Sequence, residues 1–124
     1  MMNFGEIAEF RRSEQATDFA QAWIRAQEAG DLASEWHMNL LGWSSDNPAH
    51  VLGIVLNLLD LSAENEAINE MVAIGPAEWL VEHCPDEFVI LLREAIRSHP
   101  GFALATSWKR AHSEHPRWKA LHTT

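Results

Sequence analysis

The chain has 124 residues, enough for one domain with a single modest core, and its apolar fraction of 47% argues against disorder. The one cysteine, Cys84, excludes an internal disulfide. The formal net charge of -9 is unevenly spread, because no Lys or Arg occurs between Arg25 and Arg93. An acidic middle of this kind disfavours direct binding to nucleic acid or an anionic membrane and favours basic partners.

The N-terminal segment MMNFGEIAEFRR has acidic residues where a signal peptide would be basic, and it has no apolar core of its own. No apolar run in the chain approaches the length that spans a membrane. We therefore expect a cytoplasmic protein, in a bacterium or encoded by a phage.

The N-terminal third predicts three helical segments. Residues 1–12 form an arm whose apolar side chains recur every third residue, enough for a short helical turn. A helix then runs from about residue 13 or 17 to residue 29, and Gly30 supplies its stop. Residues 31–43 carry apolar side chains on one face and predict another helix.

The segment Asn47–Asp60 is the predicted centre of the fold. Asn47 is a good N-cap residue, and Pro48 at the first helical position loses nothing by lacking an N–H group. From Val51 to Leu59 the residues are apolar on almost every face. A helix that is apolar all round is buried, so we expect the other helices to pack around this one.

A fourth helix is expected to begin after Ser62 as its cap and to end at Gly75-Pro76, where a fifth begins with almost no linker and runs to about His83. The residues of the fourth helix that we expect to face inward are Ala67, Ile68, Met71, Val72 and Ile74.

Two more helices are predicted over residues 87–98 and 102–111, separated by His99-Pro100-Gly101. The second of these is expected to turn Phe102, Leu104, Ala105 and Trp108 inward. Residues 112–124 form a polar and basic tail, in which Trp118 and Leu121 could dock a last turn and Trp118 is expected to be partly exposed.

The predicted fold class is therefore all-α, with six to seven short helices around the buried helix Asn47–Asp60. A compact bundle and a short stack of antiparallel helical hairpins both fit this pattern. Residues 1–124 form one domain, which comprises an arm at 1–12, a helical core at 13–111 and a basic tail at 112–124.

The stretch Met71–Trp108 resembles an uncharacterised family of small bacterial all-helical domains. The matching residues are Gly75, Pro76, Glu78, Leu80, His83, Ala95, Pro100, Phe102 and Trp108, with Trp23 and Asn47-Pro48 upstream. The chain departs from the family at Ala77, where the family has Leu in its Gly-Pro-Leu-Glu turn, and at Cys84-Pro85, where it has Gly. The family's function is unknown, so the resemblance implies an all-helical fold and no activity.

The histidines and the cysteine give weak signals for chemistry. His112, His115 and His122 lie close together in the tail, but the chain has no CxxC or HExxH motif, and a solvated tail explains them better than a metal site. His83 and Cys84 are adjacent on a helix and point about 100° apart, which disfavours a base–thiolate pair. We expect a buried structural cysteine, no metal and no cofactor.

The carboxylates carry more signal. Glu66 and Glu70 lie four residues apart, as do Glu78 and Glu82, and like charges at this spacing destabilise a helix slightly. They form either a solvated acidic surface that keeps the protein soluble or a binding surface for a basic protein, with a catalytic or metal role as a third alternative.

The sequence thus favours a non-catalytic domain that binds a basic protein, most concretely an inhibitor resembling bacterial immunity proteins, whose partner is a toxin or nuclease. The residues expected to form the binding surface are Asp60, Glu64, Glu66, Glu70, Glu78 and Glu82, with Trp43 as an aromatic anchor. Two alternatives remain: a phage-encoded inhibitor that mimics nucleic acid, and a structural accessory subunit or homo-oligomer.

Overall fold

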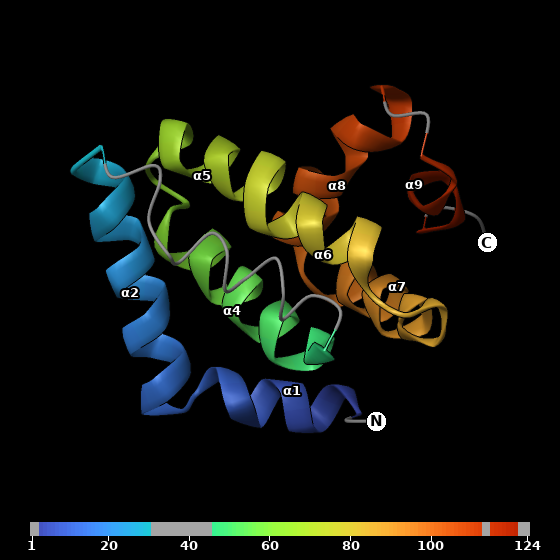
Figure 1. Cartoon of the computed structure of the whole chain (residues 1–124), viewed down its shortest axis with the longest axis horizontal. Helices are drawn as coiled ribbons and strands as arrows, with labels where there is room; N and C mark the ends of the chain where they lie inside the picture. The colour runs from blue at the N-terminus through green and yellow to red at the C-terminus, as the bar shows by residue number, and fades with distance from the viewer. Residues whose placement is uncertain (1–2, 31–45, 113–114, 122–124) are drawn as a thin grey trace.

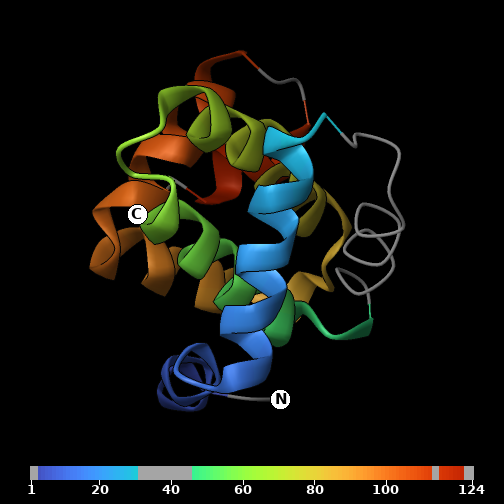
Figure 2. The same cartoon turned by 90° about the vertical axis from the view of Figure 1, so that its left-hand side faces the viewer.

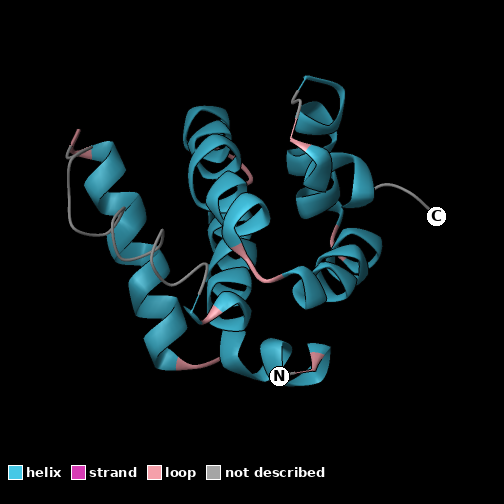
Figure 3. Ribbon diagram, turned by 45° about the vertical axis from the view of Figure 1, so that its right-hand side comes forward, coloured by secondary structure: helices cyan, strands magenta, loops and turns pink. Residues whose placement is uncertain are grey.

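A computed structural model describes residues 3–30, 46–112 and 115–121, and it is helical throughout (Figure 3). No strand occurs within these ranges, so the all-α prediction is confirmed. The described helices pack as a compact bundle around α4 (Pro48–Leu61) (Figure 1).

The first two helices, α1 (Phe4–Arg11) and α2 (Glu14–Glu28), begin at side chains that cap them. Asn3 Oδ1 accepts the Glu6 N–H at 2.8 Å, and Ser13 Oγ accepts the Ala16 N–H at 3.2 Å. Gly30 follows α2 with a φ of 79°, the left-handed conformation that ends many helices. The helix predicted over 31–43 lies outside the described residues.

Helix α4 (Pro48–Leu61) is the central helix, as predicted. It lies between α2 and the C-terminal half of the bundle, and α1 crosses its underside (Figures 1 and 2). Its side chains are buried on every face except at three positions in its C-terminal half, Asn57, Asp60 and Leu61, and at Pro48 and His50 near its start. Gly53 allows α1 to approach closely, because a Cβ atom there would lie 2.9 Å from the Phe10 ring.

The next two helices, α5 (Glu66–Val72) and α6 (Glu78–His83), are joined by the π-helical turn η1 (Ala73–Ala77). Backbone angles stay helical through the junction, and Figure 1 shows one nearly continuous rod. The predicted break at Gly75-Pro76 is therefore wrong. A wider turn hydrogen-bonded from i to i+5 carries the chain past a proline that cannot donate an N–H.

Asn65, and not Ser62, caps α5: its side chain accepts the Ile68 N–H at 3.2 Å. Ser62 instead follows α4, where its hydroxyl donates to the Leu58 carbonyl at 2.7 Å. Asn69 then donates its side-chain amide to Ser62 Oγ at 3.0 Å, which ties the rod to the end of α4.

After the short 3₁₀ turn η2 (Asp86–Phe88), helices α7 (Val89–Ser98), α8 (Pro100–His112) and α9 (Pro116–Leu121) complete the bundle. Trp118 on α9 is 0% exposed, so the predicted partial exposure of this ring is wrong. Leu121 is also buried, and Arg93 of α7 donates to the Ala120 carbonyl from both Nε and Nη2. Two residues of the predicted tail, Trp118 and Leu121, are therefore part of the core.

Candidate protein-binding surface

The carboxylates singled out from the sequence lie on or beside the rod formed by α5, η1 and α6. Five residues of this rod recur at every fourth position on its outer side, and we call them the acidic row. They are Glu66, Glu70, Ile74, Glu78 and Glu82. The first three are exposed and the last two are half-buried, while the rod contains no Lys or Arg.

Burial along the rod shows how the acidic row stays on one side. Ile68, Val72, Pro76, Leu80 and Cys84 are all buried and also recur every fourth residue. In a regular α-helix such a row drifts by about 40° per step, or about 160° over four steps. The π turn in the middle winds less per residue and opposes this drift, so one side of the rod faces the core over its whole length.

Three of the predicted carboxylates make no contact with a charged or hydrogen-bonding group among the described residues. Glu64, Glu66 and Glu70 are exposed, and no ion pair or hydrogen bond to another described residue engages their side chains. Glu66 and Glu70 lie one helical turn apart, where their like charges repel weakly. Because no cation lies on the rod, this charge is left for solvent or a partner.

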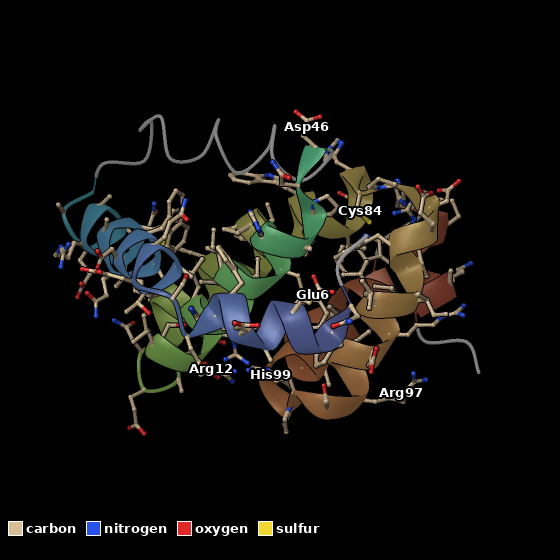
Figure 4. All side chains as sticks on the ribbon, turned by 90° about the horizontal axis from the view of Figure 1, so that it is seen from below. Glu6, Arg12, Asp46, Cys84, Arg97 and His99 are labelled. Carbon is tan, nitrogen blue, oxygen red and sulfur yellow. The ribbon has the colours of Figure 1, made fainter. Side chains whose placement is uncertain are left out.

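Asp60 is different, because its carboxylate joins three segments of the chain. Arg11 of α1 donates from Nη2 to Asp60 Oδ2, and His99, the residue before α8, lies 2.8 Å from Asp60 Oδ1 through Nε2. Arg11 also exchanges hydrogen bonds with the Asn57 side chain, each 3.0 Å long. Figure 4 shows His99 beside α1. The sequence predicts Asp60 on the binding surface. In the structure its carboxylate connects α4 to α1 and to the start of α8.

Both ring nitrogens of His99 are engaged. The Phe102 N–H donates to Nδ1 at 3.0 Å, which places the ring hydrogen on Nε2, facing Asp60. The ring therefore caps the first turn of α8 and presents no ring nitrogen to a substrate. This cluster of Arg, Asp and His connects α1, α4 and the start of α8.

Glu82 is also engaged, since its Oε1 accepts the Trp118 Nε1–H at 3.1 Å. Arg117, the residue before Trp118, caps the C-terminal end of α6. Its Nη1 donates to the carbonyls of Val81 and Cys84 at 3.0 and 2.9 Å, and its Nη2 pairs with Asp86 at 2.7 Å. A cation at a helix C-terminus is favoured by the helix dipole as well as by these bonds.

Cys84, labelled in Figure 4, is 4% exposed, and its Sγ lies 2.9 Å from Arg117 Nη1. Burial raises the pKa of the Cys84 thiol, although the charge of Arg117 lowers it in part. The buried, protonated thiol fits the structural role predicted from the sequence. His83 is exposed while Cys84 is buried, so the two adjacent side chains face different environments.

Ile74 and Ala67 lie at the surface and not in the core. The prediction that both face inward is wrong, because Ile74 is 56% exposed and Ala67 is also exposed. The reason is the strict four-residue spacing of the core side, which places Ile74 between Glu70 and Glu78 on the outer side. Leu104, expected inward on α8, is also wrong at 73% exposed.

A hollow of about 200 Å³ lies between α1, α2 and the start of α4. It is lined by Phe10, Gln15, Phe19, Asn47, His50 and Ile54, and the rings of Phe10 and His50 stack 4.2 Å apart within it. Its volume is below the usual range of about 300–1,000 Å³ for ligand sites. None of its lining residues belongs to the acidic row.

Two predicted features cannot be placed. Trp43, the expected aromatic anchor, lies outside the described residues, and so does His122 of the histidine group. His115 is described, and its Nδ1 accepts the Arg117 N–H at 3.2 Å. In the described ranges no group of three or more His, Cys, Asp or Glu residues is placed to hold a metal ion.

Comparison with known protein families, curated proteins and solved structures gives no match for this chain. The resemblance drawn from Met71–Trp108 therefore stays a prediction. Among the described helices, none combines the length and the apolar character needed to cross a membrane.

Proposed function

We propose that this chain is a small acidic protein-binding domain that acts like an immunity protein, covering a basic surface of a partner such as a bacterial toxin. The binding surface is the exposed end of the rod, with Glu64, Glu66 and Glu70 as its charged contacts. Asp60 and Glu82 bind side chains of other helices, so they are not assigned to these contacts.

One observation carries the proposal: the rod presents uncommitted carboxylates and has no cation of its own. A folded helix normally gains from pairing Glu with Lys one turn later, and α5 instead places two Glu residues at that spacing. Such an arrangement lowers the stability of the helix slightly. A binding role explains why it is present, because an array of negative charge speeds encounter with a cationic surface.

The test starts from capture of the tagged chain with its bound partner from the native host, followed by identification of that partner. Association and dissociation rates are then measured for the purified pair at low and high salt. We expect association to slow strongly as salt rises, and the double variant Glu66→Lys/Glu70→Lys to lower the affinity by at least about tenfold.

The matched control reverses two exposed carboxylates outside the rod, in the variant Glu87→Lys/Glu94→Lys. It changes the net charge of the chain by the same amount as the test variant. Because these two residues lie outside the proposed contacts, it should slow association only slightly. Equal affinity of the Glu66→Lys/Glu70→Lys variant and the wild type would show that the partner binds elsewhere. A host defence complex as the captured partner, in place of a toxin, would instead favour the nucleic-acid-mimic alternative.

A further inference from the structure

The acidic row contains one apolar member, and its position is specific. Ile74 is 56% exposed and lies one turn from Glu70 on one side and from Glu78 on the other. An isolated exposed apolar residue is ordinary on a protein surface. An apolar side chain centred in a row of carboxylates, on a rod without any cation, matches the usual layout of an interface, in which an apolar centre is surrounded by charge.

The backbone at this point is also specific. Ile74 lies within the π turn, and without that turn the positions after it would rotate away from Glu66 and Glu70. The turn therefore keeps Glu78 close to the line that Glu66, Glu70 and Ile74 define. The result is a straight ridge about four turns long, which is the shape that packs along another helix.

Resting on the proposed function, we infer that Ile74 is the apolar anchor of the interface and that the occupant is a cationic amphipathic helix of the partner. On that helix an apolar residue packs against Ile74, and a Lys or Arg residue one turn away meets Glu70. Charge complementarity selects this occupant, because a second copy of the chain that bound through the same face would bring another set of carboxylates against the row.

The two other large exposed apolar residues of α7 and α8 serve as controls. Ile90 is 65% exposed and Leu104 is 73% exposed, so each offers more apolar surface than Ile74. Ile90 shares its helix with Arg93 and Arg97, so its surroundings carry both signs of charge. If exposure alone decided binding, these residues would matter at least as much as Ile74.

The probes are two synthetic helical peptides that differ at one position. In the first, a Leu has a Lys four residues before it and another four residues after it; in the second, Gln replaces the Leu. We expect the wild-type chain to bind the Leu peptide about tenfold more tightly than the Gln peptide, which is the worth of burying one aliphatic side chain. Amide shifts on peptide binding should fall within residues 66–82.

The variant Ile74→Ala should abolish the preference for the Leu peptide, whereas Ile90→Ala and Leu104→Ala should retain it. All three positions are exposed, so the variants should fold as the wild type does, which far-UV circular dichroism checks. Equal binding of both peptides to the wild-type chain would overturn the anchor, and absence of binding by either peptide would overturn the helical occupant.

These outcomes are distinct from failure of the proposed function. Glu66→Lys/Glu70→Lys should weaken both peptides alike and leave the ratio between them unchanged. If that double variant leaves peptide and partner affinity untouched, the acidic surface itself is wrong. If it weakens both while Ile74→Ala changes nothing, only the apolar anchor is wrong.

Discussion

The carboxylates of this molecule fall into two groups that differ in what surrounds them. Asp60, Glu82 and Asp86 each bind a side chain from a distant part of the chain. Glu64, Glu66 and Glu70 bind none among the described residues. The first group joins helices to one another, and the second lies along a rod that has no cation.

The net charge counts all these carboxylates alike, but their contacts distinguish those that stabilise the fold from those available for binding. A charge reversal in the first group should weaken the fold, whereas one in the second should weaken binding and leave the fold intact. The four variants below test this separation, from the largest expected effect on stability to the smallest.

Replacement of Trp118 by Ala should have the largest effect. The ring is 0% exposed and its Nε1 donates to Glu82, so the variant leaves a cavity and frees a carboxylate. We expect a loss of about 3–5 kcal/mol in the free energy of unfolding, measured by urea denaturation. Leu104→Ala, at an exposed position, is the control and should change it by less than about 0.5 kcal/mol. A small loss for Trp118→Ala would mean that α9 is not part of the core.

Arg117→Met should come next. The methionine keeps most of the apolar stem but leaves the carbonyls of Val81 and Cys84 without their donor, at an expected cost of about 1–3 kcal/mol. The pKa of the Cys84 thiol should rise further, because Arg117 is the group that lowers it. Thiol alkylation followed against pH should therefore shift to higher pH. The control is Arg12→Met at an exposed position. A shift to lower pH would contradict the assigned contact.

Asp60→Asn should cost about 1 kcal/mol, since it removes the charge that Arg11 and His99 share while keeping the shape of the side chain. The expected loss in the free energy of unfolding is small because the Asp60 side chain is 54% exposed. Urea denaturation measures the loss, and high salt should reduce the difference from the wild type. Glu64→Gln, at an exposed position without a partner among the described residues, should show no such loss. If both variants behave alike, Asp60 belongs with the binding group.

The sequence predicts the helices well where local chemistry decides them. Ser13 and Gly30 mark the ends of α2, and the apolar run after Pro48 predicts the buried helix α4. The sequence does not predict contacts between distant residues. Nothing near Asp60 indicates Arg11 or His99, which are 49 and 39 residues away, and the basic composition of the C-terminal segment conceals that Trp118 is buried.

The binding surface shows the same limit in a different way. The carboxylate spacing is visible in the sequence, so Glu66 and Glu70 could be predicted. The exposure of Ile74 was not predicted, because its apolar side chain was assigned to the core together with its neighbours. In the structure Ile74 is two residues from the buried Val72, which is about 200° around a helix, so it lies on the outer side.

Glu70→Lys should have the smallest effect on stability and one of opposite sign. The introduced lysine would follow Glu66 by one turn in the favourable order, so a weak repulsion becomes a weak attraction and the free energy of unfolding rises by about 0.5 kcal/mol. Glu70→Gln, which removes only the repulsion, should give about half of that gain. Both are measured by urea denaturation beside partner affinity, which should fall as stability rises. Loss of stability by more than about 1 kcal/mol would place Glu70 among the structural carboxylates. A gain in stability with loss of affinity would show that this helix gives up stability in order to bind.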